Sequence, residues 1–241
     1  MSEQPILDLH THSNRSDGLD DPAYLITRAK QLGVDLVALA DHDTTDGWKE
    51  ASDKARELEI GFVPAIEIST HSDVKTEHGS KRISVHILAY RPRQNHKRLV
   101  HELARTRDSR VSRAKRMVEL IEKDYPISWQ EITENIREGS TVGRPAIADA
   151  LVRAGVVDDR SKAFDSILHK SSPYYISEHS LNTLDAIELA KQAGAATVIA
   201  HPLMDFPAGK STSDLPTEHF LEMVEAGLDG LEVEHRQVPE P

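Results

Sequence analysis

The sequence predicts an α/β protein in which mainly parallel strands form a sheet or a barrel. Strand and helix signals alternate through residues 1–90, which is the pattern of repeated βα units. The run at 34–40 is almost continuously apolar, as expected of a strand that is covered on both faces. Histidines and acidic residues recur where these strands should end, and active sites form at that edge in parallel α/β folds.

The first predicted elements follow one another closely. A strand covers residues 5–12, and Asp20 or Asp21 caps the next helix, with Pro22 in its first turn. Gly33 ends that helix, and the strand at 34–40 leads into a second helix over about 48–58. Two more strands are predicted at 60–68, ending at Glu67, and at 83–90.

The pattern changes over residues 95–171, which are mostly helical and contain no convincing strand. A long amphipathic helix is predicted over 99–121, with shorter helices over 145–154 and 163–168. We interpret this segment as an insertion into a domain made of residues 1–94 and 172–241. The alternation then resumes with helices at 183–194 and 218–227 and strands at 195–200 and 228–234.

The composition is that of an ordinary water-soluble protein, with 241 residues, 38% hydrophobic and 29% charged. A net charge of −11 argues against broad nonspecific binding to nucleic acid. No apolar run approaches the roughly 20 residues that a membrane span requires, and the N-terminus has no signal-peptide pattern. Cysteine is absent, which excludes disulfides and thiolate chemistry. We therefore expect a cytoplasmic protein without a membrane partner.

The strongest candidate for a functional site begins with His10 and His12. Residues two apart on a strand point to the same face, so both imidazoles should project from one strand end. Together with the nearby carboxylate of Asp17 they could bind a divalent transition metal ion. Further ligand-type residues lie at or near other predicted strand ends, namely His42, Glu67, His86 and His201.

Each of these residues also has a simpler interpretation. Asp17 precedes Gly18 and could be only a turn residue, and a single histidine is often a surface or core residue. His86 lies inside its predicted strand, so it fits the pattern less closely. The joint pattern decides in favour of metal, because five separate segments place an imidazole or a carboxylate at equivalent positions.

The ordered motifs resemble those of a known family. They read D-L-H-T-H-S at 8–13, S-D-G at 16–18, A-D-H-D-T at 40–44, P-A-I-E-I-S at 64–69, H-I-L-A-Y at 86–90 and A-H-P at 200–202. This set resembles the PHP (polymerase and histidinol phosphatase) family, whose fold is a distorted (β/α)7-type barrel with a trinuclear metal site. The helical insertion and V-G-R-P at 142–145 most resemble the branch that hydrolyses nucleotide phosphates.

The resemblance implies a role for each candidate ligand. His10, His12 and Glu67 would hold one metal ion, Glu67 would bridge to a second ion held by His86 and His201, and Asp17 and His42 would belong to a third. Because the ligands are nitrogen and oxygen only, two or three ions of manganese, iron or zinc would suit them.

The sequence departs from the family pattern at one place. The family closes the site with an Asp-x-His motif downstream of the strand that matches 228–234, and this chain stops at Pro241 first. We therefore expect the last part of the barrel to be missing and the first and third ions to bind more weakly than the second. Asp205 or His235 could substitute for the missing ligands.

The resemblance implies phosphoester hydrolysis by a metal-activated hydroxide held at Glu67. We expect phosphate release from a small nucleotide, either a nucleoside 5′-monophosphate or a 3′,5′-bisphosphate, with residues 95–171 as a substrate cap. Arg144 is the candidate for phosphate binding, because a guanidinium group donates two parallel hydrogen bonds to oxygens. Its alternative role is that of a helix-start residue before Pro145.

Three other functions remain open. Residues 97–116 carry eight basic side chains against Glu102 and Asp108, which could guide short RNA in a 5′-3′ exoribonuclease. Such a run is also typical of the solvated side of an amphipathic helix, and aromatic residues for base stacking are sparse there. The second open function is that of a histidinol-phosphate-type phosphatase, and the third is that of a non-catalytic metal-binding scaffold.

Overall fold

The computed structural model describes residues 4–76, 79–135, 142–177, 180–202 and 217–233. The chain divides into two compact units. The first unit comprises Met1–Ala104 with Ser180–Pro241, and the second comprises Arg105–His179. The boundary falls inside α3 (Lys97–Ile121), so this long helix contributes to both cores. Asp205 and His235 lie outside the described residues.

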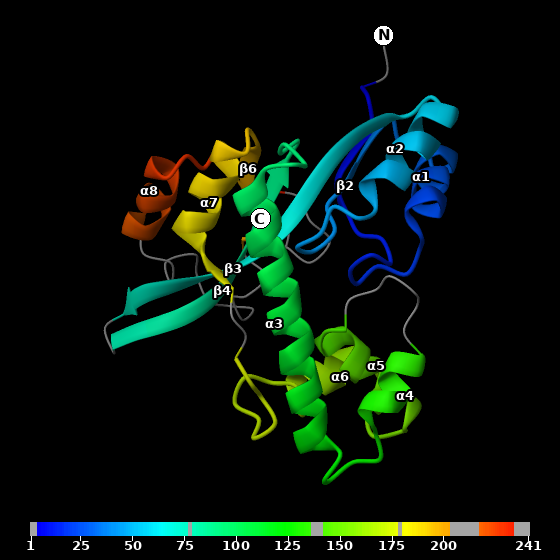
Figure 1. Cartoon of the computed structure of the whole chain (residues 1–241), viewed down its shortest axis with the longest axis vertical. Coiled ribbons are helices and arrows are strands. Elements are labelled where there is room, and N and C mark those ends of the chain that lie inside the picture. The colour runs from blue at the N-terminus through cyan, green and yellow to red at the C-terminus, as the bar shows by residue number, and fades with distance from the viewer. Residues whose placement is uncertain (1–3, 77–78, 136–141, 178–179, 203–216, 234–241) are drawn as a thin grey trace. The chain divides into compact units, whose positions relative to one another are not determined.

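The first unit is built on a sheet that curls into an open, partial barrel (Figure 1), which confirms the predicted α/β class. Its strand order is β1-β2-β3-β4-β6-β7, and β5 pairs with β3 off this path. The strands are β1 (Leu7–Thr11), β2 (Leu36–Leu39), β3 (Gly61–Thr76), β4 (Gly79–Tyr90), β5 (Leu181–Asn182), β6 (Ala196–Ile199) and β7 (Gly230–Leu231).

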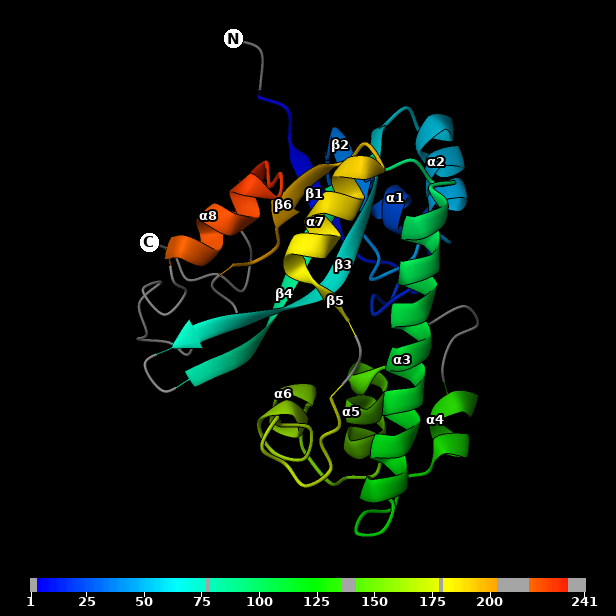
Figure 2. The ribbon, with the colours of Figure 1, turned by 60° about the vertical axis from the view of Figure 1, so that its left-hand side comes forward.

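Strand direction differs from the simple parallel pattern at β4. The pairs β1–β2, β2–β3 and β6–β7 are parallel, whereas β4 runs antiparallel to both β3 and β6. Only residues 77 and 78 separate β3 from β4, and two antiparallel strands need no longer connection. The two strands lie side by side along a ladder from Ala65↔Tyr90 to Thr76↔Gly79 (Figure 2), so both are longer than predicted.

Among the described residues, four helices cover the sheet of the first unit, in addition to the start of α3. They are α1 (Pro22–Gln31), α2 (Trp48–Glu57), α7 (Thr183–Gln192) and α8 (Thr217–Glu225). Asp21 caps α1 by accepting a hydrogen bond from the backbone N–H of Tyr24, and Pro22 opens the helix as predicted. The helices bury their apolar faces against β-strand residues such as Ile66 and Ile87.

The second unit is helical in its described part, as the sequence predicts. The remainder of α3 packs with α4 (Trp129–Glu134), α5 (Arg144–Arg153) and α6 (Arg160–Asp165). Met117, Ile147 and Leu151 are fully buried in its separate hydrophobic core. The helix α4 was not predicted, although Ser128 caps it by accepting a hydrogen bond from Glu131 N–H.

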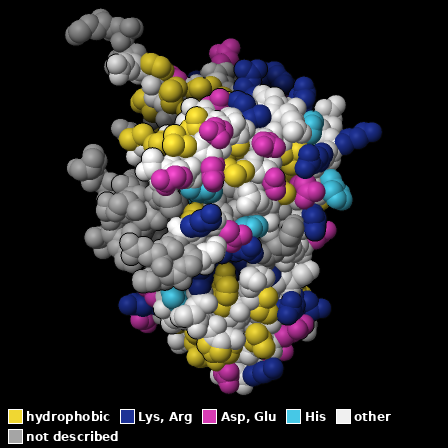
Figure 3. Space-filling view, turned by 90° about the vertical axis from the view of Figure 1, so that its left-hand side faces the viewer, with side chains coloured by type: hydrophobic (Ala, Val, Ile, Leu, Met, Phe, Trp, Pro, Cys, Tyr) yellow, Lys and Arg dark blue, Asp and Glu magenta, His cyan; other side chains and the backbone are white. Residues whose placement is uncertain are grey.

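The surface carries charges of both signs, interspersed with apolar and histidine side chains on the face shown in Figure 3. Across the described part of the chain, no helix combines the length and the apolar character needed to cross a lipid bilayer.

Candidate metal centre

The side chain of Glu67, in the middle of β3, is the centre of a cluster of imidazoles. It is 1% exposed, and its five histidine contacts come from four segments of the chain, with His10 and His12 from the same one. The shortest nitrogen–oxygen distances are 2.7 Å from His86 Nδ1, 2.9 Å from His201 Nε2, 3.0 Å from His12 Nε2, 3.1 Å from His10 Nε2 and 3.4 Å from His42 Nε2. The five histidines predicted from sequence therefore meet at one carboxylate.

The two carboxylate oxygens of Glu67 face different histidines. His10, His12 and His42 lie against Oε2. His86 and His201 lie against Oε1. A carboxylate with this arrangement is suited to join two neighbouring cation sites, one at each oxygen.

Sheet topology explains why residues so distant in sequence converge. His10 lies near the end of β1, His42 follows β2 and bridges to Glu67, and His201 follows β6. The carboxyl ends of these parallel strands share one edge of the sheet. His86 reaches the same edge from inside β4, because β4 is antiparallel and the backbone N–H of Ala200, just after β6, donates to the His86 carbonyl at 3.0 Å.

Asp17 lies at the periphery of this cluster on the loop after β1. Its carboxylate is 3.5 Å from His12 Nδ1 and 3.7 Å from His42 Nε2. Within the part of the chain that the structure describes, three groups have ligand atoms close enough to share an ion, namely His10–His12–Glu67, His12–Asp17–His42 and His42–Glu67–His86. His201 belongs to none of the three, although it contacts Glu67 directly.

The loop that carries Asp17 is held by a buried carboxylate. Asp41, 1% exposed, accepts hydrogen bonds from the backbone N–H of Ser13 and the hydroxyls of Ser13 and Ser16, at 2.6–2.7 Å. Burial raises the pKa of Asp41, and these three donors oppose the rise. The loop geometry next to His12 thus depends on the buried side chain of Asp41.

Protonation within the cluster suits cation binding. Burial would raise the pKa of Glu67, but the surrounding imidazoles, those of His42 and His86 foremost, hold it well below its usual range, so it is ionised. Burial lowers the pKa of His42, so this imidazole is neutral and offers a lone pair. Its Nδ1 is buried and has no hydrogen-bond partner among the described residues. An ionised carboxylate with a neutral imidazole beside it offers oxygen and nitrogen lone pairs of the kind that divalent transition-metal ions bind.

Glu232, directly after β7, is a site residue that the sequence reasoning did not select. Its carboxylate lies 3.1 Å from His10 Nδ1 and accepts a 2.7 Å hydrogen bond from the backbone N–H of His201. Its position could have identified it, because it lies in the predicted strand 228–234, near the edge of the sheet at which the other candidate ligands lie.

Arg144 belongs to the second unit, as the first residue of α5. Its guanidinium carbon is 5.4 Å from the ring centroid of Phe164 and 5.9 Å from that of Tyr175, so the charged group packs against two aromatic rings. No hydrogen bond or ion pair is recorded for this side chain within the described residues.

The fold and the cluster together define a metal-dependent hydrolase with an α/β architecture. A family model described as the PHP domain matches residues 8–140, which is more than half of the chain. The chain therefore belongs to the PHP domain family, as the order of its motifs predicted.

Curated relatives cover most of this chain. A protein of Haemophilus influenzae named 5′-3′ exoribonuclease is 30% identical over 94% of this chain and 78% of its own length. A 3′,5′-nucleoside bisphosphate phosphatase of Chromobacterium violaceum is 32% identical over 81% of this chain and 66% of its own length. The 5′-3′ exoribonuclease Rnm of Escherichia coli is 29% identical over 82% of this chain. The matched part spans 65% of the length of the E. coli protein.

Solved structures with 39% and 29% sequence identity share the fold. A candidate metal-dependent phosphoesterase of Bifidobacterium adolescentis superposes with a TM-score of 0.86 at 39% identity, over 98% of this chain and 79% of that chain. A structure of an amidohydrolase of Chromobacterium violaceum, with bound sulfate and no metal, gives a TM-score of 0.79 at 29% identity, over 93% of this chain and 75% of that chain.

Proposed function

We propose that the protein is a metal-dependent phosphoesterase that releases phosphate from a nucleoside 5′-monophosphate or a 3′,5′-bisphosphate. The observation that carries this proposal is the convergence of five imidazoles on the two oxygens of the buried Glu67. The names of the relatives, which include a nucleoside bisphosphate phosphatase and exoribonucleases, support a nucleotide as the phosphorylated substrate.

The cluster would hold two or three divalent ions of manganese, iron or zinc. His10, His12 and Glu67 would bind the first, Glu67, His86 and His201 the second, and Asp17 with His42 the third. Such ions, when bound, lower the pKa of a coordinated water and offset the negative charge of a phosphoryl group. Glu67 would keep the two inner cation sites at a fixed separation, because each of its oxygens faces its own set of histidines.

Arg144 would bind a phosphate oxygen of the substrate, and residues 95–171 would cap the substrate. Packing against Phe164 and Tyr175 restricts the guanidinium plane while leaving its edge donors to a ligand.

The second candidate is 5′-3′ exonuclease activity on short RNA. Three relatives bear that name, and basic residues are exposed along α3 at Lys97, Arg98, Arg105, Lys115 and Arg116. Arg113 is buried, so one of the eight basic residues is not part of such a surface. Binding of RNA through these residues would weaken steeply with added salt, and salt-independent affinity would contradict this candidate.

A panel of phosphate-release assays with added manganese tests the proposal. The substrates are AMP, adenosine 3′,5′-bisphosphate, histidinol phosphate and 5′-phosphorylated RNA, and the proteins are the wild type, His10→Ala and His101→Ala. We expect the wild type and His101→Ala, which alters an exposed histidine of α3, to release phosphate from a nucleotide. His10→Ala should lose at least 100-fold in kcat/KM, because one ligand of the first ion is gone.

The panel also separates the alternatives. Release from histidinol phosphate but not from nucleotides would reassign the substrate. Equal, background-level release by the wild type and His10→Ala would mean that the cluster is a scaffold and that no hydrolysis occurs at it.

The role of Arg144 is tested by Arg144→Ala, with Arg153→Ala on the same helix as the control. Loss of a charge-assisted hydrogen bond costs about 1.5–3 kcal/mol, so KM for a dianionic substrate should rise roughly 10- to 100-fold. Arg153 is exposed and should leave KM unchanged. An unchanged KM in Arg144→Ala would leave Arg144 with a structural role only.

A further inference from the structure

Glu232 connects two of the proposed ligand segments without being aimed at the centre of the cluster. We propose that Glu232 is a positioning residue that fixes His10 and the backbone at His201 for metal binding. This inference rests on the proposed metal site and names a residue on which its assembly depends.

The imidazole of His10 has a carboxylate at each nitrogen. Nδ1 lies 3.1 and 3.3 Å from the two oxygens of Glu232, and Nε2 lies 3.1 Å from Glu67 Oε2. An ionised carboxylate only accepts hydrogen bonds, so both ring nitrogens donate in the metal-free protein. With an ion in place of the Nε2 proton, the bond to Glu232 would keep the remaining proton on Nδ1 and leave the lone pair of Nε2 to the ion. A carboxylate behind a ligand histidine fixes both the tautomer and the orientation of the ring.

Glu232 also holds the backbone at His201. His201 has a φ of +31°, which is unusual for a residue with a side chain. Its N–H donates to Glu232 Oε2 at 2.7 Å, and the N–H of Glu232 donates to the Ile199 carbonyl at 2.9 Å. These two bonds tie the end of β7 to the end of β6, where His201 must turn its ring toward Glu67.

The carboxylate spans the gap between the outermost strands of the sheet. β1 and β7 are the two ends of the strand order, and no ladder pairing joins them within the described residues. His10 comes from β1 and Glu232 follows β7, so their contact links these ends through side chains. Because no ladder pairing sets the distance between β1 and β7 in the described chain, this side-chain contact fixes the position of His10 relative to His201.

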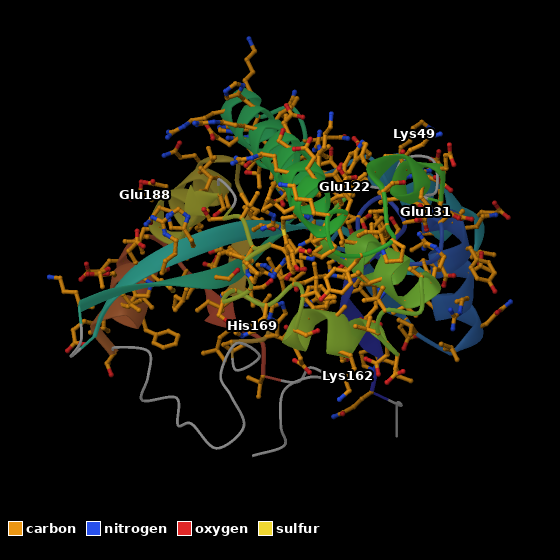
Figure 4. The ribbon with its side chains drawn as sticks, turned by 90° about the horizontal axis from the view of Figure 1, so that it is seen from below. Lys49, Glu122, Glu131, Lys162, His169 and Glu188 are labelled. Atoms are coloured by element: carbon orange, nitrogen blue, oxygen red, sulfur yellow. The ribbon has the colours of Figure 1, made fainter. Side chains whose placement is uncertain are left out.

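The experiment compares Glu232→Gln and Glu232→Ala with the wild type and with Glu188→Gln. Glu188 lies on the exposed side of α7, at the periphery of the molecule (Figure 4), and is the matched control for removing one carboxylate. Calorimetric titration with Mn²⁺ gives the affinity, elemental analysis gives the number of ions retained, and the melting midpoint without metal reports folding.

We expect Mn²⁺ affinity to fall 10- to 100-fold in Glu232→Ala, with the number of sites and the metal-free midpoint close to those of the wild type. The Mn²⁺ affinity of Glu232→Gln should lie between those of the wild type and Glu232→Ala. The single amide oxygen can accept from His10 or from His201 but does not replace both carboxylate bonds. Glu232→Gln is nearly isosteric, so it carries the test if Glu232→Ala does not fold. Glu188→Gln should bind as the wild type does.

Three results would overturn the inference. Wild-type affinity in both Glu232 variants would remove any role in metal binding. Loss of one whole ion, with the others at unchanged affinity, would make Glu232 a direct ligand instead. A fall in the metal-free midpoint with no change in affinity would leave a structural role only. A wild-type protein that binds no divalent ion would instead contradict the proposed function itself.

Discussion

His10 is the residue at which protonation would compete most directly with the proposed metal binding. Burial acts to lower its pKa, but the hydrogen bonds and charges of Glu232 and Glu67 outweigh burial and raise the pKa to about 10. In the metal-free protein His10 is therefore cationic at neutral pH. Its favourable contribution to folding is full below the unfolded value of about 6.5 and is lost as the pH rises through about 10.

Metal binding at neutral pH should therefore release protons. A cation at Nε2 needs the neutral ring, so the apparent Mn²⁺ affinity should increase as the pH rises toward about 10. Titration calorimetry at pH 7.5 in two buffers of different ionisation enthalpy measures the protons released per ion. We expect a value close to one from His10, with a further contribution from His12, whose pKa is also raised. Identical heats in both buffers would contradict this prediction.

The sequence could predict the histidines of the site but not how they are supported. His10 and His12 could be predicted as a pair because alternate residues on a strand share a face. Glu232 looks in sequence like any acidic residue near a strand end, and its partner His10 is 222 positions away. The aromatic packing of Arg144 likewise depends on tertiary contacts to Phe164 and Tyr175, which no local spacing encodes.

At the scale of elements, α7 is joined to β3 by a buried hydroxyl network. Thr183, the first residue of α7, is completely buried, and its Oγ1 lies 2.9 Å from Thr70 Oγ1 and 2.8 Å from Ser72 Oγ. Thr70 and Ser72 lie on β3 beyond Glu67, so this network fixes the part of β3 that continues from the site. Asn182 caps the same helix by accepting from the Leu184 N–H.

Thr183→Val should destabilise the protein by about 1–3 kcal/mol, because the buried hydroxyls of Thr70 and Ser72 lose a shared partner while the volume stays nearly the same. Thr183→Ser keeps the hydroxyl and should retain more of the stability than Thr183→Val. Urea unfolding of the three proteins measures the difference. If Thr183→Val were as stable as the wild type, the network would have no energetic role at this position.

The order of strands and helices was predictable, whereas strand direction and length were not. Helices such as α1 have local signals in Asp21, Pro22 and Gly33, which the structure reproduces. The ladder of β3 and β4 extends to Thr76↔Gly79 through residues with no strong strand pattern in the sequence. Pairing with the neighbouring strand stabilises these residues as strands although their own sequence pattern does not predict one. The antiparallel direction follows from the short connection, a feature of chain geometry more than of composition.

At the scale of the whole molecule, each unit has its own hydrophobic core. All seven predicted ligands and Glu232 belong to the first unit, whereas Arg144 belongs to the second. The ligand segments run from residue 10 to residue 201, so the intervening chain includes the whole second unit. Bound ions would therefore link parts of the chain that are far apart in sequence, which makes metal content a determinant of global stability.

Metal loading should therefore raise the stability of the folded protein. A ligand that binds only the native state at 100 times its dissociation constant adds about 2.7 kcal/mol, which corresponds to a rise of about 5–10 °C in the melting midpoint of a protein of this size. Scanning calorimetry with Mn²⁺, and again after EDTA, measures the shift and its reversal. His10→Ala should show a smaller shift at the same Mn²⁺ concentration, and His101→Ala the full one. Because the ions act through the native state alone, a midpoint independent of Mn²⁺ in the wild type would mean that the cluster holds no ion when folded.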